Sequence, residues 1–123
     1  MKMKDSNQPF NVLIGEELSS VEFVQDYIQF RFNGPCITAF TDPCIIIGDK
    51  QCNRMDAGFY DNLLGLIGSS VEEPFLREDE IISIHFSDRR SINISLRPED
   101  LQGGPGEAAT FDEGSGRLWI WQV

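Results

Sequence analysis

The sequence predicts a mainly β protein of the α+β class, and three observations lead to this prediction. Apolar and polar residues alternate in several short stretches, which is the period of a half-buried strand. Gly, Pro, Asn and Asp separate these stretches, as turns require. Helical spacing of apolar residues is convincing in one middle segment. We therefore expect two related antiparallel hairpin units, one middle helix and a C-terminal hairpin, arranged as a partly closed barrel or a two-layer sheet.

The length of the chain, 123 residues, suits one hydrophobic core and is too short for two. Hydrophobic residues make up 41% of the chain and charged residues 24%, which is ordinary for a globular protein. We expect a flexible, polar N-terminal lead-in over residues 1–9 and a single β-rich domain over residues 10–123.

The first hairpin follows strand-like alternation over residues 21–32. With Gly34 and Pro35 as a two-residue loop, Phe32 lies opposite Ile37. The apolar face of this unit then consists of Ile28, Phe30, Phe32, Ile37 and Ala39.

Two elements are expected between the hairpins. The run "CIIIGD" (residues 44–49) is short and β-branched, which is typical of a strand buried on both faces. In "MDAGFYDNLLGLIG" (residues 55–68) the spacing predicts a helix, capped by Asp56 at its start and by Gly68 at its end. The apolar residues at helical spacing are Phe59, Tyr60, Leu63, Leu64 and Ile67. The role of residues 44–56 is left open.

The second hairpin lies in residues 79–100. With residues 88–90 as a three-residue loop, Phe86 faces Ile92 and every apolar residue falls on one face. That face consists of Ile82, Ile84, Phe86, Ile92, Ile94 and Leu96, and the opposite face carries Ser83, His85 and Asn93. A terminal hairpin follows, in which "AATF" and "RLWIWQV" pair across "DEGSG".

The two hairpin units resemble each other. Each is preceded by the tripeptide "LIG", at residues 13–15 and again at residues 66–68. We interpret residues 13–43 and 66–100 as an internal duplication at a spacing of 53 to 55 residues, against a coincidence of ordinary hairpins. Whether the duplicated units are related by a two-fold axis stays open.

The net charge of −10 limits the classes of partner. Binding to nucleic acid or to an anionic membrane needs clusters of Lys and Arg, so neither is expected. Attraction to a basic protein is favoured instead, and a merely solvated acidic surface is the alternative. The chain shows no signal-peptide pattern and no membrane-spanning apolar run, and its three cysteines suit reduced thiols, so we expect a cytoplasmic protein.

No catalytic constellation, metal site or cofactor site is predicted. His85 is the one histidine, and the sequence places no nucleophile or carboxylate beside it. Cys36, Cys44 and Cys52 follow one another at intervals of eight residues, without the close cysteine pairs of zinc sites. The sequence therefore favours a protein that is not an enzyme.

Four aromatic residues are the candidate protein interface: Tyr27, Phe40, Trp119 and Trp121. They offer more aromatic surface than one small β domain easily covers on both sides of its sheet. We expect a second copy of the chain to cover this side in a two-fold dimer. The alternative is that the middle helix lies over these aromatics within one monomer.

Several short motifs of the chain resemble those of a protein family. The order "IG…L", "F-R-F", "LLGLIG", "I-x-F-S-D", "S-I-x-I-S-L-R-P-E-D" and "W-I-W" resembles a family of small bacterial β-rich proteins of uncharacterised function. Immunity proteins encoded beside secreted toxins are relatives of this general kind. The resemblance covers most of the chain from Leu13 onward, except "CIIIGDKQCNRMD", and implies no active-site residues.

We therefore expect a non-enzymatic protein-binding domain, immunity-like, whose acidic surface meets a basic protein such as a nuclease toxin. The alternative is a small-molecule or metal-binding domain that uses the region near His85 and the cysteines.

Overall fold

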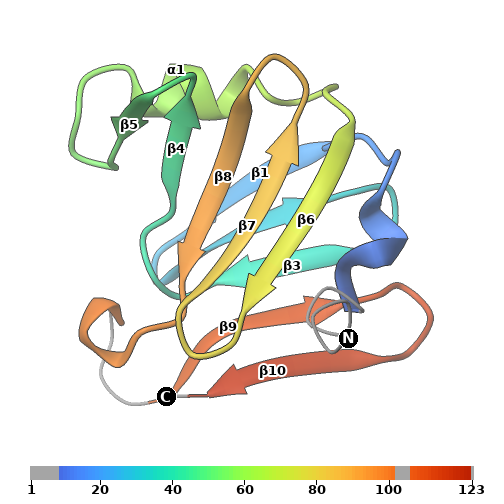
Figure 1. The fold of residues 1–123 in the computed structure, drawn as a ribbon. Helices are drawn as coiled ribbons and strands as arrows, with labels where there is room; N and C mark the ends of the chain where they lie inside the picture. The colour runs from blue at the N-terminus through green and yellow to red at the C-terminus, as the bar shows by residue number, and fades with distance from the viewer. Residues whose placement is uncertain (1–8, 102–105, 123) are drawn as a thin grey trace.

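Two antiparallel five-stranded sheets form the protein in a computed structural model that describes residues 9–101 and 106–122. The sheets face each other, and the strands of one run across those of the other (Figure 1). Neither sheet closes on itself. The predicted mainly β class is confirmed in its two-layer form, and the partly closed barrel is wrong.

The first sheet has the strand order β1-β2-β3-β9-β10, and the second has the order β5-β4-β8-β7-β6. The strands of the first sheet are β1 (Ser20–Val24), β2 (Tyr27–Arg31), β3 (Cys36–Ala39), β9 (Glu107–Asp112) and β10 (Leu118–Gln122). The strands of the second sheet are β4 (Cys44–Ile47), β5 (Lys50–Cys52), β6 (Val71–Arg77), β7 (Ile81–Phe86) and β8 (Arg90–Ser95).

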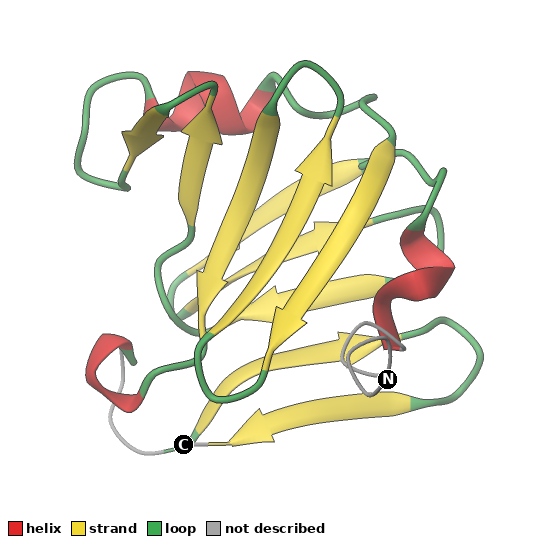
Figure 2. Ribbon diagram, in the orientation of Figure 1, coloured by secondary structure: helices red, strands yellow, loops and turns green. Residues whose placement is uncertain are grey.

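The helical segments lie at the margins of the two layers (Figure 2). They are α1 (Phe59–Leu64), η2 (Pro98–Asp100) and a 3-10 turn over residues 9–13. Residues 1–8 of the predicted lead-in lie outside the described residues, and residue 9 already belongs to the 3-10 turn.

The chain order shows a repeated pattern of strands. A three-stranded meander followed by a hairpin occurs first as β1 to β5 and then as β6 to β10. The hairpin β4-β5 pairs with β8, and the hairpin β9-β10 pairs with β3. Each half of the chain therefore contributes its hairpin to the sheet built on the meander of the other half.

The two "LIG" segments pair with each other. Gly15 and Gly68 both have positive φ, 85° and 94°, a conformation that glycine adopts without steric cost. Four backbone hydrogen bonds connect the segments: Gly15 N to Val71 O (2.9 Å), Gly68 N to Leu18 O (2.8 Å), Leu18 N to Ser69 O (3.0 Å) and Val71 N to Glu16 O (2.9 Å). A shift of 53 residues converts Gly15 to Gly68 and Leu18 to Val71, so each bond has a counterpart across a local two-fold axis. The duplication stays a prediction, which this two-fold pairing supports.

The predicted registers of both hairpins are wrong by two residues. In the first hairpin Phe30, not Phe32, is the partner of Ile37. The two-residue loop is Asn33-Gly34, whose φ angles are both positive.

In the second hairpin Ile84, not Phe86, is the partner of Ile92. Side chains alternate with a period of two residues, so a slip of two leaves every side chain on its own face. The predicted apolar faces are therefore confirmed: Ile28, Phe30, Phe32, Ile37, Ala39, Ile82, Ile84, Phe86, Ile92, Ile94 and Leu96 are all buried.

Several strand boundaries differ from the prediction. A turn at Gln25-Asp26 divides the predicted stretch 21–32 into β1 and β2. Strands β5 and β6 were not predicted at all. Strand β4 exists as expected. Ile45 is its one fully buried residue, so the prediction that both of its faces are buried is wrong.

The middle helix is shorter than predicted. It begins after Gly58, whose φ is 86°, and ends before Gly65. Asp56 does not cap it, because its carboxylate accepts a hydrogen bond from Asn53 N (2.8 Å) in the preceding turn. The buried side chains of this region are Phe59, Leu63 and Leu66, whereas Tyr60, Leu64 and Ile67 are exposed.

Candidate functional site

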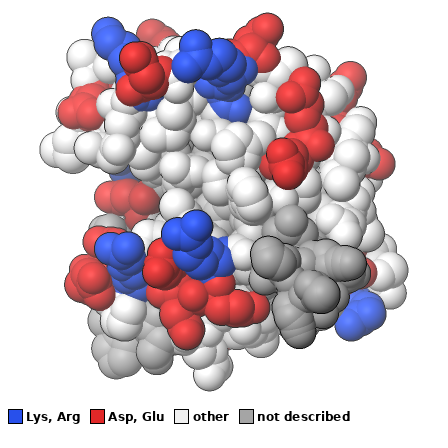
Figure 3. Space-filling view, in the orientation of Figure 1, with Lys and Arg blue, Asp and Glu red and all other residues white. Residues whose placement is uncertain are grey.

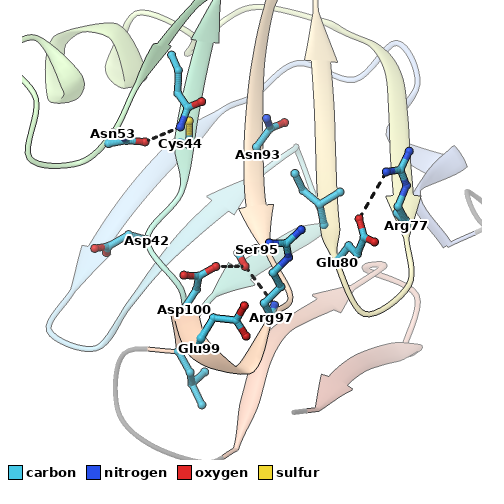
Figure 4. A pocket seen from close by; sticks show the side chains of 13 residues that line it. Asp42, Cys44, Asn53, Arg77, Glu80, Asn93, Ser95, Arg97, Glu99 and Asp100 are labelled. Atoms are coloured by element: carbon cyan, nitrogen blue, oxygen red, sulfur yellow. Dashed lines mark hydrogen bonds and ion pairs between the residues drawn. The ribbon is translucent and has the colours of Figure 1, made fainter.

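A polar groove of about 660 Å³ crosses the outer face of the second sheet (Figure 4). We call it the polar groove. Its floor is formed by Gln51 of β5, Cys44 of β4, and Asn93 and Ser95 of β8. On β8 these polar side chains alternate with the buried Ile92 and Ile94, so the pleat of the strand directs them outward. The walls come from the β6–β7 turn and from the segment that contains η2.

Hydrogen bonds hold the η2 wall against the end of β8. The Ser95 hydroxyl donates to Asp100 Oδ2 (2.7 Å) and accepts from Arg97 N (3.1 Å). Thr41 Oγ1 donates to the Ser95 carbonyl oxygen (2.8 Å). Because residues from both halves of the chain meet at Ser95, this wall is positioned by the tertiary fold.

Unpaired polar groups face the groove. Among the described residues, Arg97 and Glu99 have no side-chain hydrogen bond or ion pair, unlike Arg77 and Glu80, which pair at 3.4 Å. Asn93 accepts a hydrogen bond through its amide oxygen, which leaves its NH₂ group as a donor. The groove therefore offers free donors and a free carboxylate to a polar ligand.

The Cys44 thiol also lines the groove. Burial is the largest influence on the pKa of this thiol and raises it. The thiol therefore stays protonated at neutral pH. Thiolate is the nucleophilic form of cysteine, so Cys44 is a weak nucleophile in this position.

His85 contacts Ser83, which the sequence places on the same face of the second hairpin. Ser83 Oγ lies 3.1 Å from His85 Nε2 and 2.5 Å from Asn93 Oδ1. A hydroxyl has one hydrogen to donate, and the amide oxygen takes it in the shorter bond. His85 then donates to Ser83 rather than accepting its proton. The trio is thus arranged as a polar network on the sheet face and not as a nucleophile with its base.

The structure does not bring the three cysteines together. Cys36 is on the outer face of the first sheet, Cys44 is on the outer face of the second sheet, and Cys52 points into the core. All three thiols are free. Within residues 9–101 and 106–122, His, Cys, Asp and Glu form no group of three or more that could hold a metal ion.

The four candidate interface aromatics form two separate pairs. Tyr27 and Phe40 contact each other on the outer face of the first sheet, with ring centroids 5.5 Å apart. Trp119 and Trp121 point to the opposite, inner face and are packed against the core. The ring of Trp121 stacks on Phe10 at 5.4 Å. The aromatic ring contacts of α1 go through Tyr60 to Phe23, at 5.3 Å, and not to Tyr27 or Phe40. The sequence predicted which residues of each strand share a face. It did not predict that Tyr27 and Phe40 lie on the opposite side of the first sheet from Trp119 and Trp121.

Searches against family models, curated proteins and solved structures found no match. Among the described residues, no helix is long and apolar enough to cross a bilayer.

Proposed function

We propose that this chain is a non-enzymatic, immunity-like protein-binding domain that recognises a basic protein through its acidic surface. The observation that carries the proposal is a group of four glutamates without ion-pair partners, on the two segments that pair across the local two-fold axis. We call it the acidic cluster: Glu16, Glu17, Glu72 and Glu73. No member forms an ion pair with another described residue.

The pairing of the two "LIG" segments explains why these carboxylates gather. Glu17 bridges to Ser70, and Val71 N donates to Glu16 O (2.9 Å), which brings the segment 16–17 beside the start of β6. Figure 3 shows acidic side chains over this part of β6, on a face whose centre is uncharged. The described acidic residues that do have arginine partners are elsewhere: Glu22, Asp42, Glu80 and Asp88.

Unpaired surface carboxylates produce a negative potential that attracts a basic partner before contact. Such steering raises the association rate and weakens as salt is added, because the Debye length shortens. A basic toxin encoded beside the gene is the partner that this proposal favours.

The test measures association of the purified protein with the basic products of the adjoining genes, with oligolysine as a charge-only control. We expect Glu72→Gln with Glu73→Gln to slow association roughly threefold to tenfold at low salt, as loss of steering predicts. The matched control pair is Asp49→Asn with Asp61→Asn, two exposed acids away from the cluster. The proposal is contradicted if both pairs of substitutions slow association equally. It is also contradicted if the gene products bind no more tightly than oligolysine does.

A second candidate function rests on the polar groove. Its free donors, Arg97 and Asn93, favour a small polar ligand with acceptor groups. We expect such a ligand to raise the melting temperature of the wild-type protein in a screen of polar metabolites, and Asn93→Leu to abolish that shift. A shift that persists in the variant places the ligand elsewhere. Elemental analysis of the same sample tests the metal-binding form of this alternative.

A further inference from the structure

Four strands form the edges of the two sheets, and three of them carry features that oppose further pairing. Strand β6 contains Pro74, which has no N–H, and a bulge at its start. Strand β5 has three residues and begins with the charged Lys50. Strand β1 carries Glu22, paired with Arg31 at 3.2 Å. Shortness, charge, proline and bulges are the ordinary protections of an edge strand.

The fourth edge, β10, lacks charge and proline, and the one irregularity of its pairing with β9 lies at its end, between Trp121 and Gln122. Its sequence is Leu-Trp-Ile-Trp-Gln, and the side chains of Leu118 and Ile120 are 59% and 46% exposed. These two residues lie on the outer face of the first sheet. The other side of the strand is anchored, since Trp121 stacks on Phe10 and Trp119 Nε1 donates to Glu113 Oε2 (2.6 Å). The strand is therefore held in an extended, ordered form.

Hydrogen-bonded and non-hydrogen-bonded residue pairs alternate along the β9-β10 hairpin, and this alternation shows which backbone groups of β10 point away from β9. Glu113 N donates to Arg117 O (3.0 Å), so these two residues form a hydrogen-bonded pair. Such pairs alternate along an antiparallel ladder, which makes Trp119 and Phe111 the next bonded pair in the register. The N–H and C=O groups of Leu118 and Ile120 then point away from β9, toward the open edge. The residues with the most exposed apolar side chains on this strand are also those with outward backbone groups.

We infer that β10 pairs with β10 of a second copy of this chain, antiparallel about a two-fold axis near Ile120. The geometry is self-complementary, because outward backbone groups of one copy meet those of the other and the Leu118 and Ile120 side chains of both copies join on one face. Charge also favours this edge. Two copies with a net charge of −10 repel each other, and an uncharged strand is the edge where they approach at least cost. A basic partner, in contrast, gains no ion pair from β10.

This dimer is independent of the acidic cluster, which lies on other elements and stays available to a partner. It replaces the predicted aromatic interface by a backbone-mediated one, in which the two tryptophans remain packed within their own monomer.

The test is light scattering after size-exclusion chromatography, from micromolar to several hundred micromolar protein. We expect the wild type to reach twice the chain mass of 13.9 kDa. Ile120→Lys opposes two like charges at the interface and should weaken dimerisation roughly tenfold or more. The matched control, Val24→Lys, changes a residue of similar exposure (37%) on the opposite edge of the same sheet and should leave the dimer unchanged.

Amide hydrogen exchange on the wild-type protein gives a second readout that does not depend on a variant folding. The amides of Leu118 and Ile120 should become protected as the protein concentration rises, whereas a side-chain contact between copies leaves them unprotected. A protein that is monomeric at every concentration, or a dimer that survives Ile120→Lys, overturns the inference. Protection of these amides by a peptide, without self-association, assigns the edge to another chain and also overturns it.

Discussion

Phe86→Ala is expected to lower the free energy of unfolding by about 3–5 kcal/mol, the usual loss when a buried phenylalanine is emptied. Phe86 is 2% exposed at the end of β7, where it pairs with Val71 of β6. Removing the ring leaves a cavity between the sheets that the crossed strands fill only in part. Urea denaturation should show a lower midpoint with an unchanged slope, since the surface exposed on unfolding is nearly the same.

Phe75→Ala is the matched control. Phe75 lies on the edge strand of the same sheet but is 49% exposed, and its ring meets His85 edge-on at 5.8 Å. We expect a loss of about 1 kcal/mol or less at this exposed site. Equal losses at the two positions would mean that the inner and outer faces of the second sheet are wrongly assigned.

The faces of the strands could be predicted from the sequence, whereas their pairing could not. Alternation determines on which side of a sheet a residue lies, but it repeats every two residues and so allows registers that differ by two. The turn selects among them. In the first hairpin Asn33-Gly34 is the stronger turn pair, because both residues adopt positive φ, here 57° and 130°. The predicted loop, Gly34-Pro35, did not take this preference of the Asn-Gly pair into account.

The second hairpin offers less sequence information about its turn. Asp88 and Arg89 have φ angles of 62° and 58°, and arginine is not a residue that favours this conformation. The ladder pairs Ile82 with Ile94 and Ile84 with Ile92, and burial does not distinguish this register from the predicted one, because both place the same residues on the inner face. The turn therefore carried the missing information, and its left-handed arginine could not be recognised from the sequence.

The polar groove could not be located from the sequence, because it is built from both halves of the chain. Cys44 and Gln51 come from the hairpin that follows the first meander, and Asn93 comes from the second meander. These strands become neighbours when the hairpin β4-β5 joins the other half's sheet. The sequence did contain the outward alternation of residues 91–95, which indicated a polar face without showing what lies opposite it.

The sequence also could not show which face of the first sheet each aromatic residue occupies, because that too depends on how the strands assemble. Alternation correctly separated Trp119 and Trp121 from Leu118 and Ile120 on the last strand. It did not show that the tryptophans face the core and that Tyr27 faces the other way, because that depends on how β10 joins β9 in the first sheet.

Leu63→Ala is expected to cost about 2–5 kcal/mol, the range for a buried leucine truncated to alanine. The helix α1 has six residues, well below the length at which an isolated helix is stable in water. Its N-cap, Gly58, is in the left-handed conformation and makes no side-chain hydrogen bond to the helix. The burial of Phe59 and Leu63, both 0% exposed, must therefore supply most of its stability.

Leu64→Ala separates burial from helix propensity, because it is the same substitution at the next position of the same helix. Leu64 is 45% exposed, so we expect its loss to remain within about 1 kcal/mol. Both variants change the intrinsic helix preference equally, and the difference between their unfolding free energies reports the docking of one side of α1 alone. Denaturation curves of the two variants under identical conditions measure that difference. Should Leu63→Ala cost no more than Leu64→Ala, α1 is not held by its buried side, and its ends, closed by Gly58 and Gly65, would have to position it instead.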